Sequence, residues 1–200
     1  ELIGYFDDTP NDAVVRAIPG AGTHVPVWIL GSSLYGAQLA AYLGLPYAFA
    51  SHFAPDLLEQ ALSIYRSTFQ PSPSLARPYA MMAAGVCAAE TDAEADFLRS
   101  SQFLAFARLR TGKPGKLPYP TENIASEMPA PVLAQVKHAL SCSATGSPTT
   151  VRDQLCNLVA RYQPDELMVT GMIHDPAARV RSFQIAAEVL ADLVRKTGAA

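Results

Sequence analysis

The chain has 200 residues, of which half are apolar and 16% are charged, and its formal net charge is −3. An apolar chain with so little net charge is typical of a folded protein rather than a disordered one. It has no basic stripe that would favour nucleic-acid binding, and no apolar run near the roughly 20 residues of a membrane span. Three cysteines without CxxC spacing disfavour a disulfide framework or a zinc site, and they favour the reducing cytoplasm.

Residues 1–25 are predicted to be irregular, because turn-forming residues cluster at 7–10 and 19–22. A short strand is predicted at Val14–Ala17.

The first full strand is predicted at 25–30, a continuous apolar run typical of a strand covered on both faces. Gly31 follows it, and Ser32 or Ser33 can cap the helix that comes next. Gly44 is well suited to end that helix.

Two further strand and helix pairs follow. Residues 47–50 predict a strand, and Pro55 lies near the first turn of the helix after it. Residues 79–88 are again apolar and strand-like. Thr91 then predicts a helix start, with Glu94 placed as in a capping box.

The alternation is interrupted by an insertion at about 101–146, in which 131–140 predicts a short helix. A helix is predicted from Ser147, a strand at 166–170, and a last helix from Asp175. Strands that alternate with helices indicate an α/β fold with parallel strands. No linker divides the chain, so residues 1–200 are expected to belong to one domain.

The segment 27–36 contains the strongest local signal for a binding site. A buried strand leads through Gly31, Ser32 and Ser33 into a helix that begins near Gly36. Free backbone N–H groups at a helix N-terminus favour an anion, and a phosphate is the natural ligand. The segment is neither a GxGxxG motif, a P-loop nor a GxSxG motif. From this pattern alone, an ordinary serine cap with glycines for packing is the better explanation.

Polar residues also follow two other predicted strands. Ser51 and His52 come after the second strand, at the end where ligands bind in parallel α/β folds. His52 is a candidate general acid or base, or a histidine satisfied by a loop carbonyl. His174 and Asp175 follow the last strand, and Asp175 is most simply a helix cap. The histidines show no metal-binding spacing, so no metal site is expected.

Long strings of the sequence resemble the bacterial luciferase-like flavin monooxygenases. The resemblance is carried by residues 26–33 and 39–55, and by 146–152, 165–170 and 174–182 near the end of the chain. It is weakest at 101–146.

This resemblance implies an eight-stranded (β/α) TIM barrel, of which the chain covers about the second half. The four predicted strands would then be strands five to eight, and the insertion would lie over the active site as a lid near Tyr119. A missing N-terminal half-barrel is expected to be cleaved, outside the given sequence or supplied by another chain. Such a half-barrel has open sheet edges and an exposed apolar face.

The resemblance also implies a flavin at the carboxyl end of the barrel, as reduced FMN or, in one branch, a deazaflavin. Ser33 matches a phosphate-binding serine of the luciferases, and Ser32 is its neighbour. Gly36 stands where the luciferases carry a hydroxyl residue, which leaves only a backbone contact there. The residues matching the strand end near the flavin ring are Ala50, Ser51 and His52.

The expected function is that of a cytoplasmic flavin-dependent monooxygenase that uses reduced FMN and oxygen on an organic substrate. His52 is the candidate catalytic residue, a flavin reductase the expected supplier, and a homodimer the expected assembly. The fragment alone is expected to be inactive. The alternatives are a deazaflavin-dependent oxidoreductase, or a non-catalytic flavin-binding or dimer-forming paralogue, which Gly36 would favour.

Overall fold

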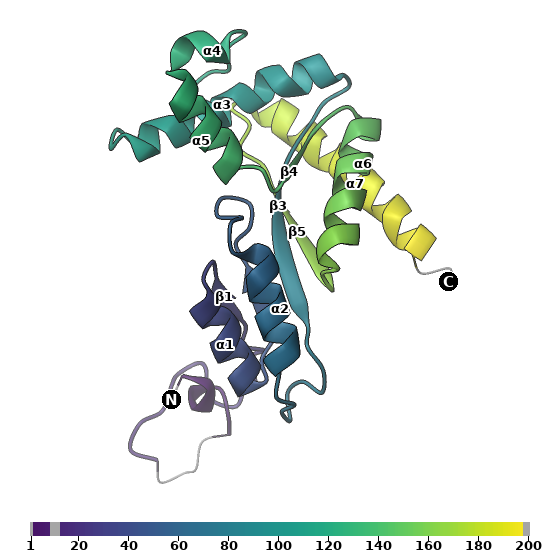
Figure 1. The fold of residues 1–200 in the computed structure, drawn as a ribbon. Coiled ribbons are helices and arrows are strands. Elements are labelled where there is room, and N and C mark those ends of the chain that lie inside the picture. Colours follow the sequence, from purple (N-terminus) through teal and green to yellow (C-terminus); the bar gives the residue numbers. More distant parts are fainter. Residues whose placement is uncertain (1, 9–12, 198–200) are drawn as a thin grey trace.

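The computed structural model describes residues 2–8 and 13–197, and it shows a parallel sheet with helices packed against it (Figure 1). A short 3-10 helix at Ile3–Tyr5 is followed by irregular chain. The strand predicted at Val14–Ala17 is wrong: these residues are irregular, and Val14 is 99% exposed. Exposed β-branched residues do not form a strand where no neighbouring strand pairs with them. Residues 9 and 10 of the predicted turn at 7–10 lie outside the described residues.

The described residues form a five-stranded sheet in which every pairing is parallel. The strands are β1 (Ile29–Gly31), β2 (Tyr47–Phe49), β3 (Ala80–Ala88), β4 (Ser143–Gly146) and β5 (Glu166–Thr170). The α-helices are α1 (Leu34–Leu43), α2 (Leu58–Thr68), α3 (Asp92–Arg110), α4 (Ile124–Glu127), α5 (Ala130–Ala139), α6 (Pro148–Tyr162) and α7 (Pro176–Thr197). The predicted α/β class with parallel strands is therefore confirmed.

The long strand β3 organises the sheet. Its first residues pair with β2, and residues 81–85 pair with β5 on the opposite edge. Residues 85–88 pair with β4, which lies beyond the end of β2 on the same edge. The sequence did not predict β4, because Ser143–Gly146 consists of small residues and has none of the apolar pattern of the other strands.

One face of β1, β2 and β3 packs against α1 and α2. Tyr47, Phe49 and Met82 point to this side and are almost fully buried together with Tyr65 of α2. A second cluster joins β3 and β4 to α6 and α7 through residues such as Leu155. These two clusters hold the helices in place, and Figure 1 shows α1 and α2 beside the first strands and α6 and α7 beside β4 and β5.

Several helix boundaries follow from the sequence as expected. The Thr91 hydroxyl accepts a hydrogen bond from the Glu94 amide and caps α3. Gly44 ends α1 with φ at 61°, a conformation that favours glycine. The first strand is shorter than predicted, because only residues 29–31 find partners in β2.

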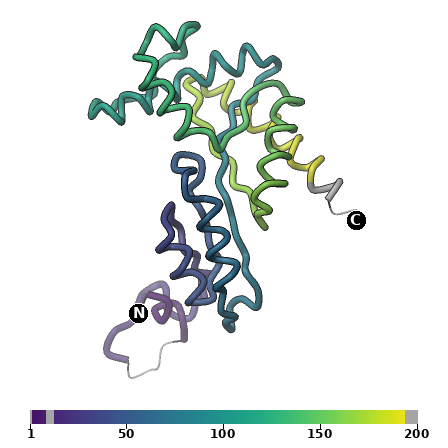
Figure 2. Tube along the Cα trace, in the orientation of Figure 1, coloured from purple at the N-terminus to yellow at the C-terminus, as the bar shows by residue number. Residues whose placement is uncertain are grey.

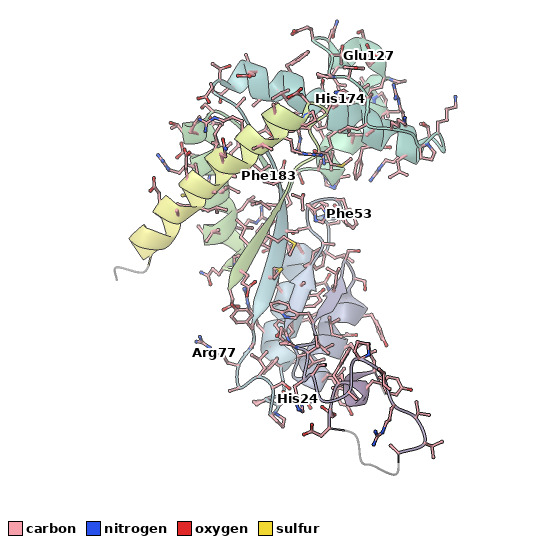
Figure 3. All side chains as sticks on the ribbon, turned by 180° about the vertical axis from the view of Figure 1, so that it is seen from behind. His24, Phe53, Arg77, Glu127, His174 and Phe183 are labelled. Carbon is pink, nitrogen blue, oxygen red and sulfur yellow. The ribbon has the colours of Figure 1, made fainter. Side chains whose placement is uncertain are left out.

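The predicted insertion at 101–146 begins inside α3, which continues to Arg110, and contains α4, α5 and β4. These helices gather at the carboxyl end of β3, whereas residues 2–8 lie at its amino end (Figure 2). The side-chain view agrees: Phe53 and His174 lie toward the insertion, and His24 and Arg77 lie at the opposite end (Figure 3). The insertion therefore lies where ligands bind in parallel α/β folds.

The sheet is open in the described part of the chain. In these pairings β1 bonds only to β2, and β5 bonds only to β3. Leu30 on β1 is 71% exposed, and Met168 on β5 is 51% exposed. The face opposite α1 and α2 is thus apolar and accessible.

Candidate functional site

A cavity of about 500 Å³ lies on the open face of the sheet, at the ends of β1 and β2 and across to β3 and β5. Its lining is almost wholly apolar and carries no aspartate, glutamate, lysine or arginine among the described residues. The lining residues are Trp28, Leu30, Gly31, Ser32, Ala48, Phe49, Ala50, His52, Phe53, Met81, Ala83 and Met168.

The alternation of side chains along the strands explains which residues reach this cavity. Leu30 pairs with Ala48, and Ala48 pairs with Met81, so the three stand in one row on the open face. Two residues further along β3, Ala83 pairs with Met168 of β5. Alanines occupy two of these positions, Ala48 and Ala83. Small side chains therefore leave this space open.

The turn between β1 and α1 borders one side of the cavity. Ser32 lines the cavity, while Ser33 is the N-cap residue of α1 and is exposed. The Ser33 side chain makes no capping hydrogen bond, so the predicted serine cap is not formed. The first amides of α1 are therefore not capped by this hydroxyl, an arrangement suited to an anion.

Gly36 lies in the first turn of α1, over the aromatic ring of Tyr47. A Cβ at Gly36 would lie 3.5 Å from Tyr47 Cε2 and 3.8 Å from the Gly31 Cα, which are ordinary contacts. Packing alone therefore does not require glycine at this position. The Tyr47 hydroxyl donates a hydrogen bond to the carbonyl oxygen of Ser33 (3.3 Å) and ties the turn to β2.

Ser51 is fully buried and does not line the cavity. Its hydroxyl donates to the Ala83 carbonyl oxygen and accepts from the Ala83 amide (3.1 Å). Ala83 lies on β3 between the last residue paired with β2 and the first paired with β4. Ser51 thus supplies backbone partners in the gap between those two strands. Its predicted contact with a flavin stays a prediction, and the hydroxyl is already engaged.

His52 lines the cavity, and its ring packs edge-on against Phe53 with centroids 4.6 Å apart. Its Nδ1 is buried and has no hydrogen-bond partner, so no loop carbonyl satisfies that atom. Burial lowers the pKa of His52, which favours the neutral imidazole near neutral pH. The ring can therefore act as a base or as a neutral hydrogen-bonding group.

His174 and Asp175 follow β5 at the carboxyl end of the sheet, and neither lines this cavity. The His174 ring packs on the ring of Tyr119 from the insertion loop, with centroids 4.1 Å apart. Asp175 accepts a hydrogen bond from the Ala178 amide (2.7 Å), which is the helix-capping role that the sequence predicts. The contact between Tyr119 and His174 joins the insertion to the loop after β5.

A second, polar hollow of about 400 Å³ shares Phe53 with the apolar cavity. Its wall includes Asp56, Arg110 and His138, and His138 Nε2 contacts Asp56 Oδ1. Sequence reasoning missed this hollow, because its residues come from α3, α5 and the loop after β2. No spacing in the sequence indicates that these three segments meet.

The remaining candidate chemistry is limited in the part of the chain that the structure describes. No group of three His, Cys, Asp or Glu residues is arranged to hold a metal ion there. Cys87 and Cys142 are buried free thiols, and burial raises the pKa of Cys87 to about 11. None of the helices in residues 2–8 and 13–197 has the length and apolar character needed to cross a membrane.

Comparison with known proteins identifies related sequences and folds. The sequence model of the family described as luciferase-like monooxygenase matches residues 5–163. A luciferase-like monooxygenase of Escherichia coli K12 is 46% identical over 194 residues, which are 97% of this chain and 58% of that protein. The chain therefore spans little more than half the length of this curated relative.

Solved structures agree with the fold. The crystal structure of apo-MsnO8 has 33% sequence identity and a TM-score of 0.76, and the match covers 90% of this chain and 55% of that one. The oxygenating constituent of 3,6-diketocamphane monooxygenase from Pseudomonas putida, solved in complex with FMN, has 19% identity and a TM-score of 0.55. That match covers 86% of this chain and 50% of the Pseudomonas protein, and at this identity it bears on the fold alone.

Proposed function

The chain belongs to the luciferase-like monooxygenase family, and we propose that it forms the flavin-binding half of a (β/α)8 barrel that uses reduced FMN and oxygen on an organic substrate. One observation carries this proposal. An uncharged apolar cavity opens at the carboxyl ends of parallel strands, next to a helix N-terminus that its own serine does not cap. A flavin combines an apolar ring with an anionic phosphate, and these two features match those parts.

The residues present fit the phosphate at the turn after β1. Ser32 and Ser33 would supply hydroxyl groups to the phosphate. The first backbone amides of α1 form the positive end of the helix dipole, which favours an anion at the same turn. Gly36 adds no side chain, so this turn would bind the phosphate through two hydroxyls and backbone. A basic partner for the phosphate would come from the remainder of the barrel.

The residues present also fit the flavin ring along Ala50 and His52, which line the cavity. When bound, reduced FMN supplies the chemistry that activates oxygen. The chain's own part is to keep water away with Trp28, Met81 and Met168 and to offer His52 as a neutral group beside the reacting centre. Tyr119, held against His174, would close this end of the sheet from above.

The same proposal accounts for the open edges of the sheet. Strands from an N-terminal half-barrel would pair with the free edges of β1 and β5 and cover Leu30 and Met168. We further propose that the complete protein is a cytoplasmic homodimer and receives reduced flavin from a separate reductase. The chain without its complement would be inactive, because half of the cavity wall is not its own.

The test compares FMN with riboflavin, which lacks the phosphate. In titrations of the complete barrel followed by flavin fluorescence, Ser33→Ala should weaken FMN binding about tenfold, the effect of losing one hydrogen bond to a charged group. Riboflavin binding should not change. Ser67→Ala, an exposed serine on α2, is the matched control. Equal binding of FMN and riboflavin would contradict the phosphate site.

The reaction is tested with the complete barrel and chemically reduced FMN. Oxygen consumption that depends on added organic substrate is expected for a monooxygenase. Flavin binding without substrate-dependent consumption would instead indicate a non-catalytic paralogue. Hydride transfer with a deazaflavin but not with FMN would indicate the deazaflavin-dependent reaction.

A further inference from the structure

We propose that the polar hollow is a second ligand site, which binds a small molecule that carries a carboxylate or phosphate group on a flat apolar body. The site lies between the insertion and the loop after β2, and Arg110 is its anion-binding group. Its residues are not those of the proposed flavin site. The inference therefore goes beyond the proposed function and does not depend on it.

Three segments that are far apart in the sequence enclose this hollow of about 400 Å³. Residues 53–56 come from the loop after β2, Arg110 ends α3, and the remaining wall belongs to α5. Phe53 and Pro55 supply apolar surface, and Phe53 is 43% exposed. The volume lies within the range of about 300–1,000 Å³ that is usual for small-molecule sites. The hollow can therefore hold a molecule with an apolar part and a polar part.

The guanidinium of Arg110 is available to an anion. Arg110 is exposed, and no carboxylate pairs with it in the part of the chain that the structure describes. Asp56 is the one carboxylate among the described wall residues, and it already contacts Nε2 of His138. A guanidinium presents a fork of N–H donors that fits a carboxylate or phosphate with two hydrogen bonds. An incoming oxyanion can therefore bind Arg110 without displacing an ion pair.

The segments around the hollow are poor in negative charge, although the whole chain has a net charge of −3. Residues 97–121, which include most of α3 and the loop after it, contain five arginines or lysines and no aspartate or glutamate. Residues 128–152, which include α5, also contain no aspartate or glutamate. A local excess of positive charge attracts anions in preference to neutral or cationic ligands.

The hollow is also placed where a ligand would affect the rest of the structure. Phe53 lines both the hollow and the apolar cavity, and its ring packs against that of His52. A ligand bound to Arg110 and to this ring would connect the insertion with the loop after β2. Because it binds the folded protein, it should also raise the thermal midpoint.

The test measures the binding of three small probes to the complete barrel by isothermal titration calorimetry. Phenyl phosphate and benzoate carry the two kinds of anion on the same ring, and benzyl alcohol is a neutral analogue. At least one anion should bind about tenfold or more tightly than benzyl alcohol, and the stronger of the two identifies the group that the site prefers. Arg110→Gln should weaken binding of that anion at least about tenfold, the effect of losing charge-assisted hydrogen bonds.

The matched control is Arg108→Gln, the same change two residues earlier on α3. Arg108 is exposed and does not line the hollow, so its loss should change the affinity less than about twofold. Equal losses in the two variants would overturn the site, because binding would then reflect only the general positive charge of α3. Anions that bind the unmodified protein no better than benzyl alcohol would also overturn it, and that comparison needs no variant.

FMN titrations of the same proteins separate this inference from the proposed function. Arg110→Gln should leave the FMN affinity unchanged, and Ser33→Ala should leave the affinity for the preferred probe unchanged. If the probes behave as expected and Ser33→Ala does not affect FMN, the second site stands and the flavin phosphate assignment fails. If Arg110→Gln weakens FMN binding as much as probe binding, the hollow holds the flavin phosphate and the separate site is wrong.

Discussion

The two faces of β1, β2 and β3 differ sharply although their residues alternate along the same strands. The face toward α1 and α2 carries Tyr47, Phe49 and Met82, each at most 1% exposed. The opposite face carries the exposed Leu30 and, along the cavity, Ala48, Ala50 and Ala83, of which Ala50 and Ala83 are each 7% exposed. Large side chains on one face hold the helices to the sheet, and small ones on the other leave room for a ligand. Under the proposed function, folding and ligand binding therefore depend on alternate residues of the same strands.

The packed face is also held by specific contacts. The rings of Tyr47 and Tyr65 lie 5.4 Å apart, and the Tyr65 hydroxyl donates to the Leu45 carbonyl oxygen (2.9 Å). The open face has no comparable network in the described residues, where Trp28 makes an edge contact with Tyr79. Mutations on the two faces should therefore separate stability from binding.

The largest effect is expected for Phe49→Ala on the packed face. Removing a fully buried phenyl ring should lower the free energy of unfolding by about 3–5 kcal/mol, because it leaves a cavity between β2 and the helices. Urea denaturation followed by circular dichroism measures this change.

Leu30→Ala is the corresponding change on the open face, at the position that pairs with Ala48 of β2. Because Leu30 is largely exposed, the loss of stability should stay below about 1 kcal/mol. A loss comparable to that of Phe49→Ala would mean that the open face is packed in solution, and the contrast between the faces would fail.

A medium effect is expected for Ser51→Ala. The hydroxyl satisfies both backbone groups of Ala83 in a fully buried position, so its removal should lower stability by about 1–3 kcal/mol. The same urea titration measures it, and Ser67→Ala on the surface of α2 is the control. If Ser51→Ala weakens flavin binding without any loss of stability, the residue serves the ligand and not the strand gap.

The sequence predicted the α/β class and four strands because their apolar runs are long or strongly patterned. It missed β4, whose small residues carry no apolar pattern and become a strand through their pairing with β3. It also predicted a strand at 14–17, where the structure has irregular chain. Strand formation in both segments depends on tertiary partners that a local pattern does not encode.

The candidate site was predictable where polar residues directly follow the end of a strand. Ser32 and His52 line the cavity because they lie one or three residues after β1 and β2. Ser51 precedes His52 in the sequence, but its hydroxyl bonds to the Ala83 backbone and it does not line the cavity. The gap that this hydroxyl fills exists because β2 ends at Phe49. The alanines gave no signal, because an alanine in an apolar run indicates burial and says nothing about an open space beside it.

A small effect of opposite sign is expected for Gly36→Ala. The added methyl group meets Tyr47 and β1 at ordinary contact distances, and alanine favours the helix over glycine by about 0.5–1 kcal/mol. The thermal midpoint should therefore rise slightly. Gly44→Ala is the contrasting control and should destabilise, because φ is 61° and the new Cβ would lie 2.5 Å from the Gln70 carbonyl oxygen. A loss of stability in Gly36→Ala would show that the turn depends on a closer approach to β2.

The smallest effect is a pH dependence carried by His52, which lines the cavity. Burial lowers the pKa of this imidazole below its ordinary value of 6.5, so below that pH the unfolded chain binds more protons than the folded chain. His52 should therefore lower stability as the pH falls from about 7.5 to about 5.5, and His52→Gln should remove that part of the decline. The difference in urea midpoint between the two proteins measures it, since the other three histidines are present in both and cancel. A difference that stays constant across this range would mean that the His52 ring is solvated, and the open face would then hold a wetter cavity than its apolar lining indicates.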